Sequence, residues 1–169
     1  MTELAIYQKV YEFAAHAHDT RALKPENRFR KNGKGEKTQI PYITHPVAVK
    51  DIAINRANDY YPAGSRPIFL VSLVALFHDV LEDTDVTLIE LTLFVDSLLP
   101  LDESNLVLEA VILLTKNKEN FNIITYLSKI RLNPLATIVK LSDLDHNMSD
   151  LKTGNLLDKY KLCHYFLTQ

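Results

Sequence analysis

Apolar residues recur at helical spacing along most of the chain. In residues 3–18, for example, Leu4, Tyr7 and Val10 follow one another at intervals of three, a spacing typical of an amphipathic helix. The stretch from Ile68 to Glu82 is apolar on nearly all sides, which predicts a central, buried helix. Further helices are expected at residues 46–58, 88–99, 103–115, 120–132, 135–149 and 155–167.

The pattern as a whole predicts an all-α fold. No window alternates apolar and polar residues between hairpin turns, as strands of an antiparallel sheet would. There is also no internal repeat and no composition change of the kind that marks a linker. We therefore expect one all-α domain over residues 1–169, with about seven or eight helices.

Residues 19–42, which we call the basic loop, break the helical pattern. They contain Gly33, Gly35 and two prolines, and loops of this length in a compact domain are usually functional. Arginine and lysine suit the binding of polyphosphates, whereas an ordinary solvated loop is an equally weighted alternative. From Arg21 to Lys37, only Glu26 and Glu36 oppose the positive charges, which are Arg21, Lys24, Arg28, Arg30, Lys31, Lys34 and Lys37.

The sequence HDVLED at residues 78–83 places four chemical groups close together. On a continuous helix, His78, Asp79, Glu82 and Asp83 would fall within an arc of roughly 140°. Burying three carboxylates and an imidazole together is unfavourable unless a cation or hydrogen bonds compensate. A metal site is therefore favoured over the alternative of a solvated, acidic helix end.

Two other segments supply candidate ligands. His45 lies in PYITHP, and Asp143 lies in TIVKLSDLDHNM after an apolar run. Together with the His-Asp pair they provide two imidazole nitrogens and two carboxylates, a set that suits Mn²⁺, Fe²⁺ or Zn²⁺ with open positions. Such an ion activates water and polarises phosphoryl oxygens. Glu82 and Asp83, one turn further along, would orient that water or transfer protons.

Composition limits the other possibilities. The formal charge of −2 predicts no general attraction to nucleic acid or to anionic membranes. The one cysteine, Cys163, cannot form an internal disulfide, as is usual in reducing compartments. The longest apolar run, Ile68 to Phe77, has about half the length that spans a bilayer. We expect a soluble, cytoplasmic protein. Asp145 and Asp150 are expected to be solvated, and we interpret as surface or core residues His16, His18, His146 and His164.

Five motifs occur in an order that is similar to a known family: AHAHDTR, PYITHP, ALFHDVLEDTDVT, LLTK and VKLSDLDHNMSDL. Over residues 5–152 the chain resembles the hydrolase domain of RelA/SpoT homologues, especially the stand-alone small alarmone hydrolases. The resemblance implies a helical HD-domain fold and a role in the stringent response. It implies Mn²⁺-dependent removal of the 3′-pyrophosphate from guanosine tetraphosphate and pentaphosphate (ppGpp and pppGpp).

The resemblance also assigns roles to single residues. It implies a metal site of His45, His78, Asp79 and Asp143, with Glu82 and Asp83 as the acidic pair that activates water. Lys140 and Asn147 correspond to positions of the family motif near the substrate, where the asparagine is a substrate contact. About twenty residues separate Arg21 from PYI, where the family has only a few. The substrate-facing loop residues are therefore Arg30 with Lys31, or alternatively Arg21.

The chain departs from the family at the end of the last motif. Leu144-Asp145 and Ser149-Asp150 stand where the family tends to have Arg-Leu and Arg-Thr, near the nucleoside. An adenine alarmone or NADPH is therefore an alternative substrate to the guanosine alarmones. A nucleotide sensor without catalytic activity is a third, less favoured hypothesis.

Overall fold

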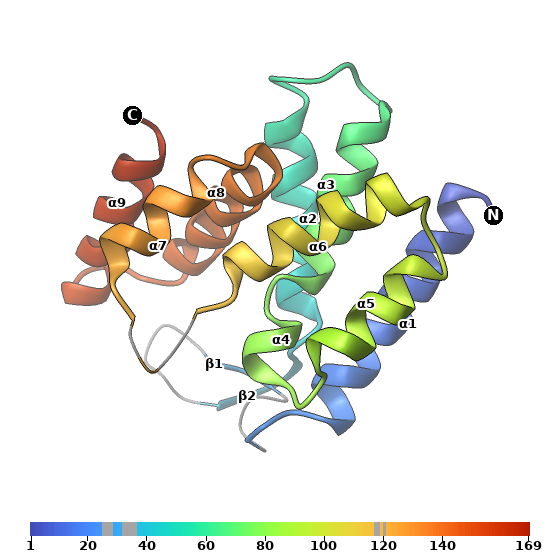
Figure 1. Ribbon diagram of the computed structural model, residues 1–169. Helices are drawn as coiled ribbons and strands as arrows, with labels where there is room; N and C mark the ends of the chain where they lie inside the picture. Colours follow the sequence, from blue (N-terminus) through green and yellow to red (C-terminus); the bar gives the residue numbers. More distant parts are fainter. Residues whose placement is uncertain (25–28, 32–36, 117–118, 120) are drawn as a thin grey trace.

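The computed structural model describes residues 1–24, 29–31, 37–116, 119 and 121–169 (Figure 1). Helices account for most of this part of the chain, which confirms the predicted all-α class. They are α1 (Glu3–Thr20), α2 (Thr44–Ala57), α3 (Arg66–Phe77), α4 (Val80–Asp83), α5 (Leu88–Asp96), α6 (Leu101–Leu114), α7 (Ile123–Ile130), α8 (Pro134–Ser149) and α9 (Asn155–Leu167). None of the helices in these described ranges is long and apolar enough to cross a membrane.

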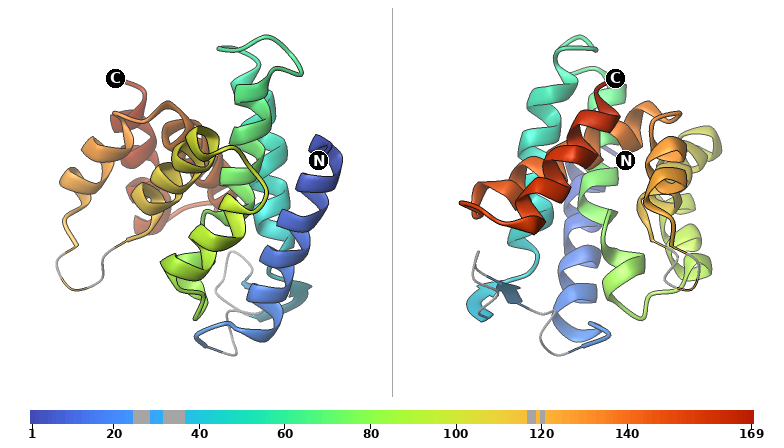
Figure 2. Two further views of the ribbon diagram at one scale, coloured as in Figure 1. Left: turned by 45° about the vertical axis from the view of Figure 1, so that its right-hand side comes forward. Right: turned by 90° about the vertical axis from the view of Figure 1, so that its left-hand side faces the viewer.

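Helix α3 lies at the centre of the molecule. Every residue from Leu70 to Phe77 is buried, because the helix packs against α1, α2, α6 and α8 (Figure 2). An element surrounded on all sides must be apolar around its whole circumference, which is what the sequence showed. The α3 helix therefore ends inside the protein, and the residues that follow it start from a buried position.

Capping side chains begin several of the helices. Thr2 accepts a hydrogen bond from the amide of Ala5, and Thr87 accepts one from the amide of Glu90. Asn133 accepts one from the amide of Ala136, and Pro134 occupies the first turn of α8. Such caps satisfy amides that have no partner within the helix. The local sequence thus fixes where α8 begins, and Asp143 lies further along the same helix.

The predicted continuous helix from Ile68 to Glu82 is interrupted in the structure. Helix α3 ends at Phe77 and α4 begins at Val80, while Asp79 adopts φ −107° and ψ −4°. The Nδ1 atom of His78 lies 2.7 Å from the carbonyl oxygen of Ala75, which is the acceptor that a continuous helix offers to the amide of residue 79. Competition of this kind favours a turn, so His78 and Asp79 lie between two helices.

A short antiparallel hairpin interrupts the basic loop, where no regular structure was predicted. Strand β1 (Phe29–Lys31) pairs with β2 (Lys37–Pro41), with Phe29 opposite Pro41. Strands of three and five residues are too short to reveal a period of two. The hairpin lies near the C-terminal end of α1 (Figure 1), and β2 leads directly into α2 and His45.

Candidate metal centre and its cavity

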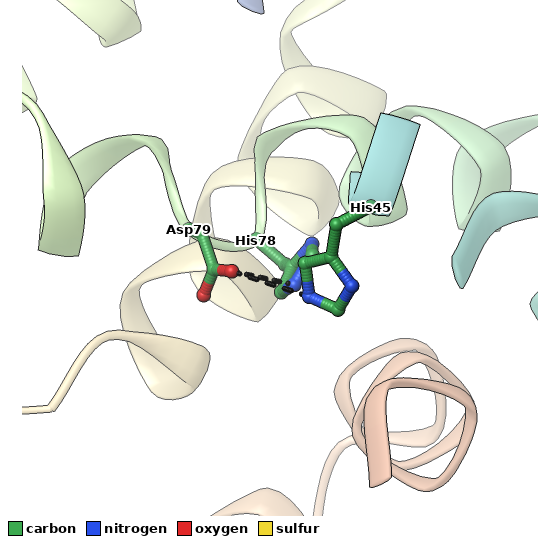
Figure 3. Close-up of side chains that lie close together, drawn as sticks. All are labelled: His45, His78 and Asp79. Carbon is green, nitrogen blue, oxygen red and sulfur yellow. Dashed lines mark ion pairs between the residues drawn. The ribbon is translucent and has the colours of Figure 1, made fainter. Parts of the chain in front are cut away.

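Four side chains from three parts of the chain meet at one point. His45 comes from the first turn of α2, His78 and Asp79 from the turn between α3 and α4, and Asp143 from α8. Figure 3 shows the two imidazoles and the Asp79 carboxylate pointing toward one another. From Asp79 Oδ2, His78 Nε2 lies 3.0 Å away and His45 Nε2 3.5 Å away. Asp143 Oδ1 lies 3.2 Å from His45 Nε2 and 3.8 Å from His78 Nε2.

This arrangement fits a divalent metal ion. One ligand atom each from His45, His78 and Asp79 lies within 4.8 Å of the others, and Asp143 adds a second carboxylate. The Nε2 atom of His78 is buried and makes no hydrogen bond of good geometry, although Asp79 Oδ2 lies 3.0 Å away, whereas buried polar atoms normally have a hydrogen-bond partner. A mixed set of nitrogen and oxygen ligands suits Mn²⁺, Fe²⁺ or Zn²⁺, so a bound ion would provide the missing partner.

The charges at this centre also favour a cation. Burial lowers the pKa of His78, but the carboxylates of Asp79 and Asp143 raise it to about 9. Burial raises the pKa of Asp79, but His78 and His45 hold it well below its usual range. Two buried carboxylates therefore remain ionised, and in the metal-free protein a proton on His78 balances part of their charge. A bound metal ion would take the place of that proton, because an imidazole binds metal in its neutral form.

The outer nitrogens of both imidazoles have hydrogen-bond partners. His45 Nδ1 lies 2.7 Å from His146 Nδ1, and His78 Nδ1 lies 2.7 Å from the Ala75 carbonyl oxygen. Metal-binding imidazoles usually have such a partner, which fixes the tautomer and the ring orientation. His146 had been interpreted as a surface or core residue. The sequence did indicate that His146 could lie near the metal centre, because it follows Asp143 by three positions and residues three apart share a helix face.

Tyr42 contacts the candidate metal centre, and His18 packs against Tyr42. The hydroxyl of Tyr42 donates a hydrogen bond of 2.6 Å to Asp79 Oδ2, and its ring lies 4.7 Å from that of His18. His18 is buried and neither of its ring nitrogens has a hydrogen bond. Its pKa is lowered to about 4, mainly by burial, with His78 and His45 adding to the effect and the charge of Asp79 opposing it. His18 is therefore a neutral core residue at neutral pH.

Lys140 and Asn147 hold the carboxylate of Asp143 from either side. Lys140 Nζ donates a bond of 2.7 Å to Oδ2, and Asn147 Nδ2 donates one of 2.6 Å to Oδ1. Burial lowers the pKa of Lys140, but the Asp143 carboxylate raises it above its ordinary value. Lys140 is therefore charged. Both residues also line a cavity of about 350 Å³ beside the metal centre.

The cavity contains the acidic pair and several lysines. Glu82 and Asp83 line it together with Lys116 and Lys159, and its apolar wall includes Phe121, Ile123 and Leu156. Lys116 Nζ lies 2.9 Å from Glu82 Oε1. Burial and the charges of Asp79 and Glu82 raise the pKa of Asp83 to about 6. Asp83 can therefore exchange a proton near neutral pH, as a general base or acid must.

The residues expected from the basic loop have different surroundings. The guanidinium of Arg21 donates hydrogen bonds to the side chains of Asp85 and Glu90. The backbone of Arg30 and Lys31 lies in β1, whereas their side chains lie outside the described part of the structure. The structure therefore brings Lys140 and Asn147 to the cavity and places Arg21 in an ion-pair cluster.

Asp145, which was expected to be solvated, is instead half-buried in an ion-pair cluster. Its carboxylate lies 2.5 Å from Arg56 Nη2 and 3.3 Å from His164 Nε2. Its neighbour Leu144 lines the cavity. Adjacent helical residues point about 100° apart, so these two of the four residues that depart from the family motif have separate surroundings. Leu144 faces the cavity, and Asp145 joins α2, α8 and α9.

Comparison with known proteins supports the fold. No protein-family model and no curated protein sequence matches the chain. A solved structure of a metazoan orthologue of SpoT, described as hydrolysing ppGpp and having a role in starvation responses, is similar to it with a TM-score of 0.64. The match is 23% identical and covers 96% of this chain and 83% of the other. The two chains share one fold, and the expected helical bundle is confirmed.

Proposed function

We propose that this protein is a divalent-metal-dependent phosphohydrolase that removes the 3′-pyrophosphate of guanosine tetraphosphate and pentaphosphate. The observation that carries the proposal is the meeting of four potential metal ligands with an acidic pair and lysines at one cavity. The activity described for the similar metazoan protein, hydrolysis of ppGpp, supports it. The products are GDP or GTP and pyrophosphate.

In this proposal His45, His78, Asp79 and Asp143 hold the ion, which we propose to be Mn²⁺. When bound, a divalent ion acts as a Lewis acid that polarises a phosphoryl oxygen and lowers the pKa of water. Tyr42 orients Asp79 through its hydrogen bond. Lys140 and Asn147 orient Asp143.

The acidic pair performs the proton transfer. Asp83, with a pKa near 6, accepts a proton from the attacking water as its oxygen bonds to phosphorus. The bond from phosphorus to the nucleoside 3′ oxygen breaks, and that oxygen takes up a proton from water, to which Asp83 returns the proton that it accepted. Glu82, which Lys116 holds in the cavity wall, orients the water. General bases are most effective when their pKa lies near the operating pH.

Positive charge around the cavity binds the phosphates. Lys116, Lys140 and Lys159 line it, and lysine neutralises phosphate charge as a point cation. Arg30 and Lys31 are proposed to approach the substrate from the basic loop, and Asn147 contacts it from α8. The transferred group is then surrounded by groups that stabilise developing negative charge.

The direct test is to incubate the purified protein with Mn²⁺ and guanosine tetraphosphate. GDP and pyrophosphate should appear in equal amounts, and a chelator should stop their release. Glu82→Gln should retain bound metal and lose turnover, because the carboxylate that orients water is gone. Absence of turnover with Mn²⁺, Fe²⁺, Zn²⁺ and Mg²⁺ would contradict the proposal.

A second candidate substrate is another phosphorylated nucleotide, such as an adenine alarmone or NADPH. Leu144 lines the cavity near the apolar side chains of Ile123 and Leu156, and these groups offer a base only apolar contact. A substrate panel distinguishes the candidates, since release of phosphate from NADPH without alarmone hydrolysis would favour this one. Tight nucleotide binding by the metal-loaded protein without turnover would instead indicate a sensor.

A further inference from the structure

Arg21 joins the end of α1 to a segment 64 positions further along the chain. Its Nε donates a bond of 2.6 Å to Asp85 Oδ1, and its Nη2 donates one of 2.9 Å to Glu90 Oε2. Its Nη1 donates to the other oxygen of Glu90. The guanidinium therefore holds the Glu90 carboxylate with two parallel bonds, the geometry in which arginine and carboxylate pair most strongly.

Backbone hydrogen bonds support the same junction. The amide of Leu23 donates to the carbonyl of Asp83 over 2.9 Å, and the amide of Asp85 donates to the carbonyl of Arg21 over 3.0 Å. These two bonds flank an isolated antiparallel bridge between Ala22 and Thr84. The start of the basic loop and the segment after α4 thus form a small two-stranded contact, which the side chain of Arg21 closes.

The contact matters because it includes Asp83, whose carboxyl group lines the cavity. Helix α4, which carries Asp83, has only four residues, and so short a helix has little stability of its own. The carbonyl of Asp83 accepts its hydrogen bond from Leu23, outside the helix. The position of this acidic residue therefore depends on a contact with a distant part of the chain.

The side chain of Arg21 is not directed at the substrate. It is absent from the described residues that line the cavity, and its Nε, Nη1 and Nη2 all donate to carboxylates. A phosphate group would have to displace two acidic side chains to reach it. These contacts favour a structural link to the site over a substrate contact.

We propose that Arg21 is a positioning residue, which clamps the Asp83–Asp85 segment onto the end of α1 and so places Asp83 for hydrolysis. The inference rests on the proposed function for its catalytic consequence. The clamp also fixes the first residues of the basic loop beside the acidic pair, while the other end of the loop leads to Tyr42 and His45.

The first test compares Arg21→Gln with Glu90→Gln, since each removes the same paired hydrogen bonds from one side. Both variants should lower kcat by roughly tenfold because misplaced catalytic groups act poorly, with KM within twofold of the wild type. The double variant should be no worse than Arg21→Gln alone, which also loses the bond to Asp85. Lys9→Gln, an exposed change on the same helix, should have no effect. A rise in KM confined to Arg21 variants would overturn the proposal.

The second test needs no substrate and no metal. Hydrogen exchange at the amides of Leu23 and Asp85 should accelerate in Arg21→Gln and Glu90→Gln, while the amide of Leu91 in α5 keeps its protection. Arg21→Lys keeps the positive charge but cannot form the two parallel hydrogen bonds to Glu90, so its exchange rates should be intermediate. It also provides a milder change if Arg21→Gln unfolds. Unchanged exchange at both amides would refute the clamp. Accelerated exchange in a protein that hydrolyses no nucleotide would support the clamp and contradict the proposed function.

Discussion

At the scale of single residues, the two imidazoles of the candidate metal centre are fixed in different ways. His78 is oriented by the main-chain carbonyl of Ala75, and His45 by the side chain of His146. In both rings Nε2 faces the carboxylates and Nδ1 faces a partner. Only the partner of His45 can be removed by a substitution, so the importance of this orientation can be measured there.

His146→Ala should therefore weaken metal binding. Loss of such an outer partner typically lowers metal affinity by about 10- to 100-fold, while the four ligands and the fold remain. Titration of the metal-free protein with Mn²⁺, followed by calorimetry, measures the change. His164→Ala removes a histidine that contacts Asp145 and serves as the matched control. Equal affinity in the His146 variant and the wild type would show that His45 needs no such partner.

His18 should make the metal-free protein less stable in mild acid. Its pKa is lowered from 6.5 to about 4. Between these two pH values His18 is protonated in the unfolded chain but neutral in the folded protein. The contribution of neutral His18 to the free energy of unfolding is complete above pH 6.5. It is lost as the pH falls toward 4, which lowers the free energy of unfolding by roughly 3 kcal/mol for a pKa shift of this size. Urea unfolding at several pH values should show a weaker pH dependence in His18→Leu. An unchanged pH dependence would assign the effect to other groups.

At the scale of elements, the site depends on where helices begin and end. His45 lies in the first turn of α2, and the break between α3 and α4 presents His78 and Asp79. Asp143, by contrast, lies within α8, whose first turn is fixed by the Asn133 cap and Pro134. The site therefore combines side chains at helix ends with one that is carried by a long, well-capped helix.

Asn133→Ala should destabilise α8 without changing the metal centre. The side-chain oxygen of Asn133 accepts a bond of 3.0 Å from the amide of Ala136, and loss of such a cap lowers the free energy of unfolding by about 1 kcal/mol. Asn133→Asp keeps an acceptor and should behave like the wild type. Chemical denaturation measures both variants. A fall in Mn²⁺ affinity in Asn133→Ala would mean that the cap also determines the position of Asp143.

At the scale of the whole molecule, much of the fold could be predicted because apolar spacing and capping residues are local signals. Helix α9, for example, occupies Asn155–Leu167, as expected from the sequence. The break at His78 could not be predicted, because it depends on a side chain competing for the Ala75 carbonyl. The contact of His146 with His45 joins residues 101 positions apart, and helical spacing alone does not show what such a residue faces.

Metal binding should stabilise the whole fold, because the ligands meet only in the folded chain. An ion at about one hundred times its Kd adds roughly 2.7 kcal/mol, which for a domain of this size raises the Tm by roughly 5 to 10 °C. Thermal unfolding with Mn²⁺ and with a chelator measures the shift. His78→Ala should remove it, and a full shift in that variant would contradict the ligand assignment.

The loop between α2 and α3 lies at the opposite end of the molecule from the hairpin (Figure 1), and its residues Pro62, Ala63 and Gly64 are exposed. Cleavage there would leave His45 on one fragment and the other three candidate ligands on the second. Neither piece alone would hold a complete centre, but reassembly would restore it. The protein thus offers a split reporter, in which recovery of Mn²⁺ affinity measures fragment complementation directly.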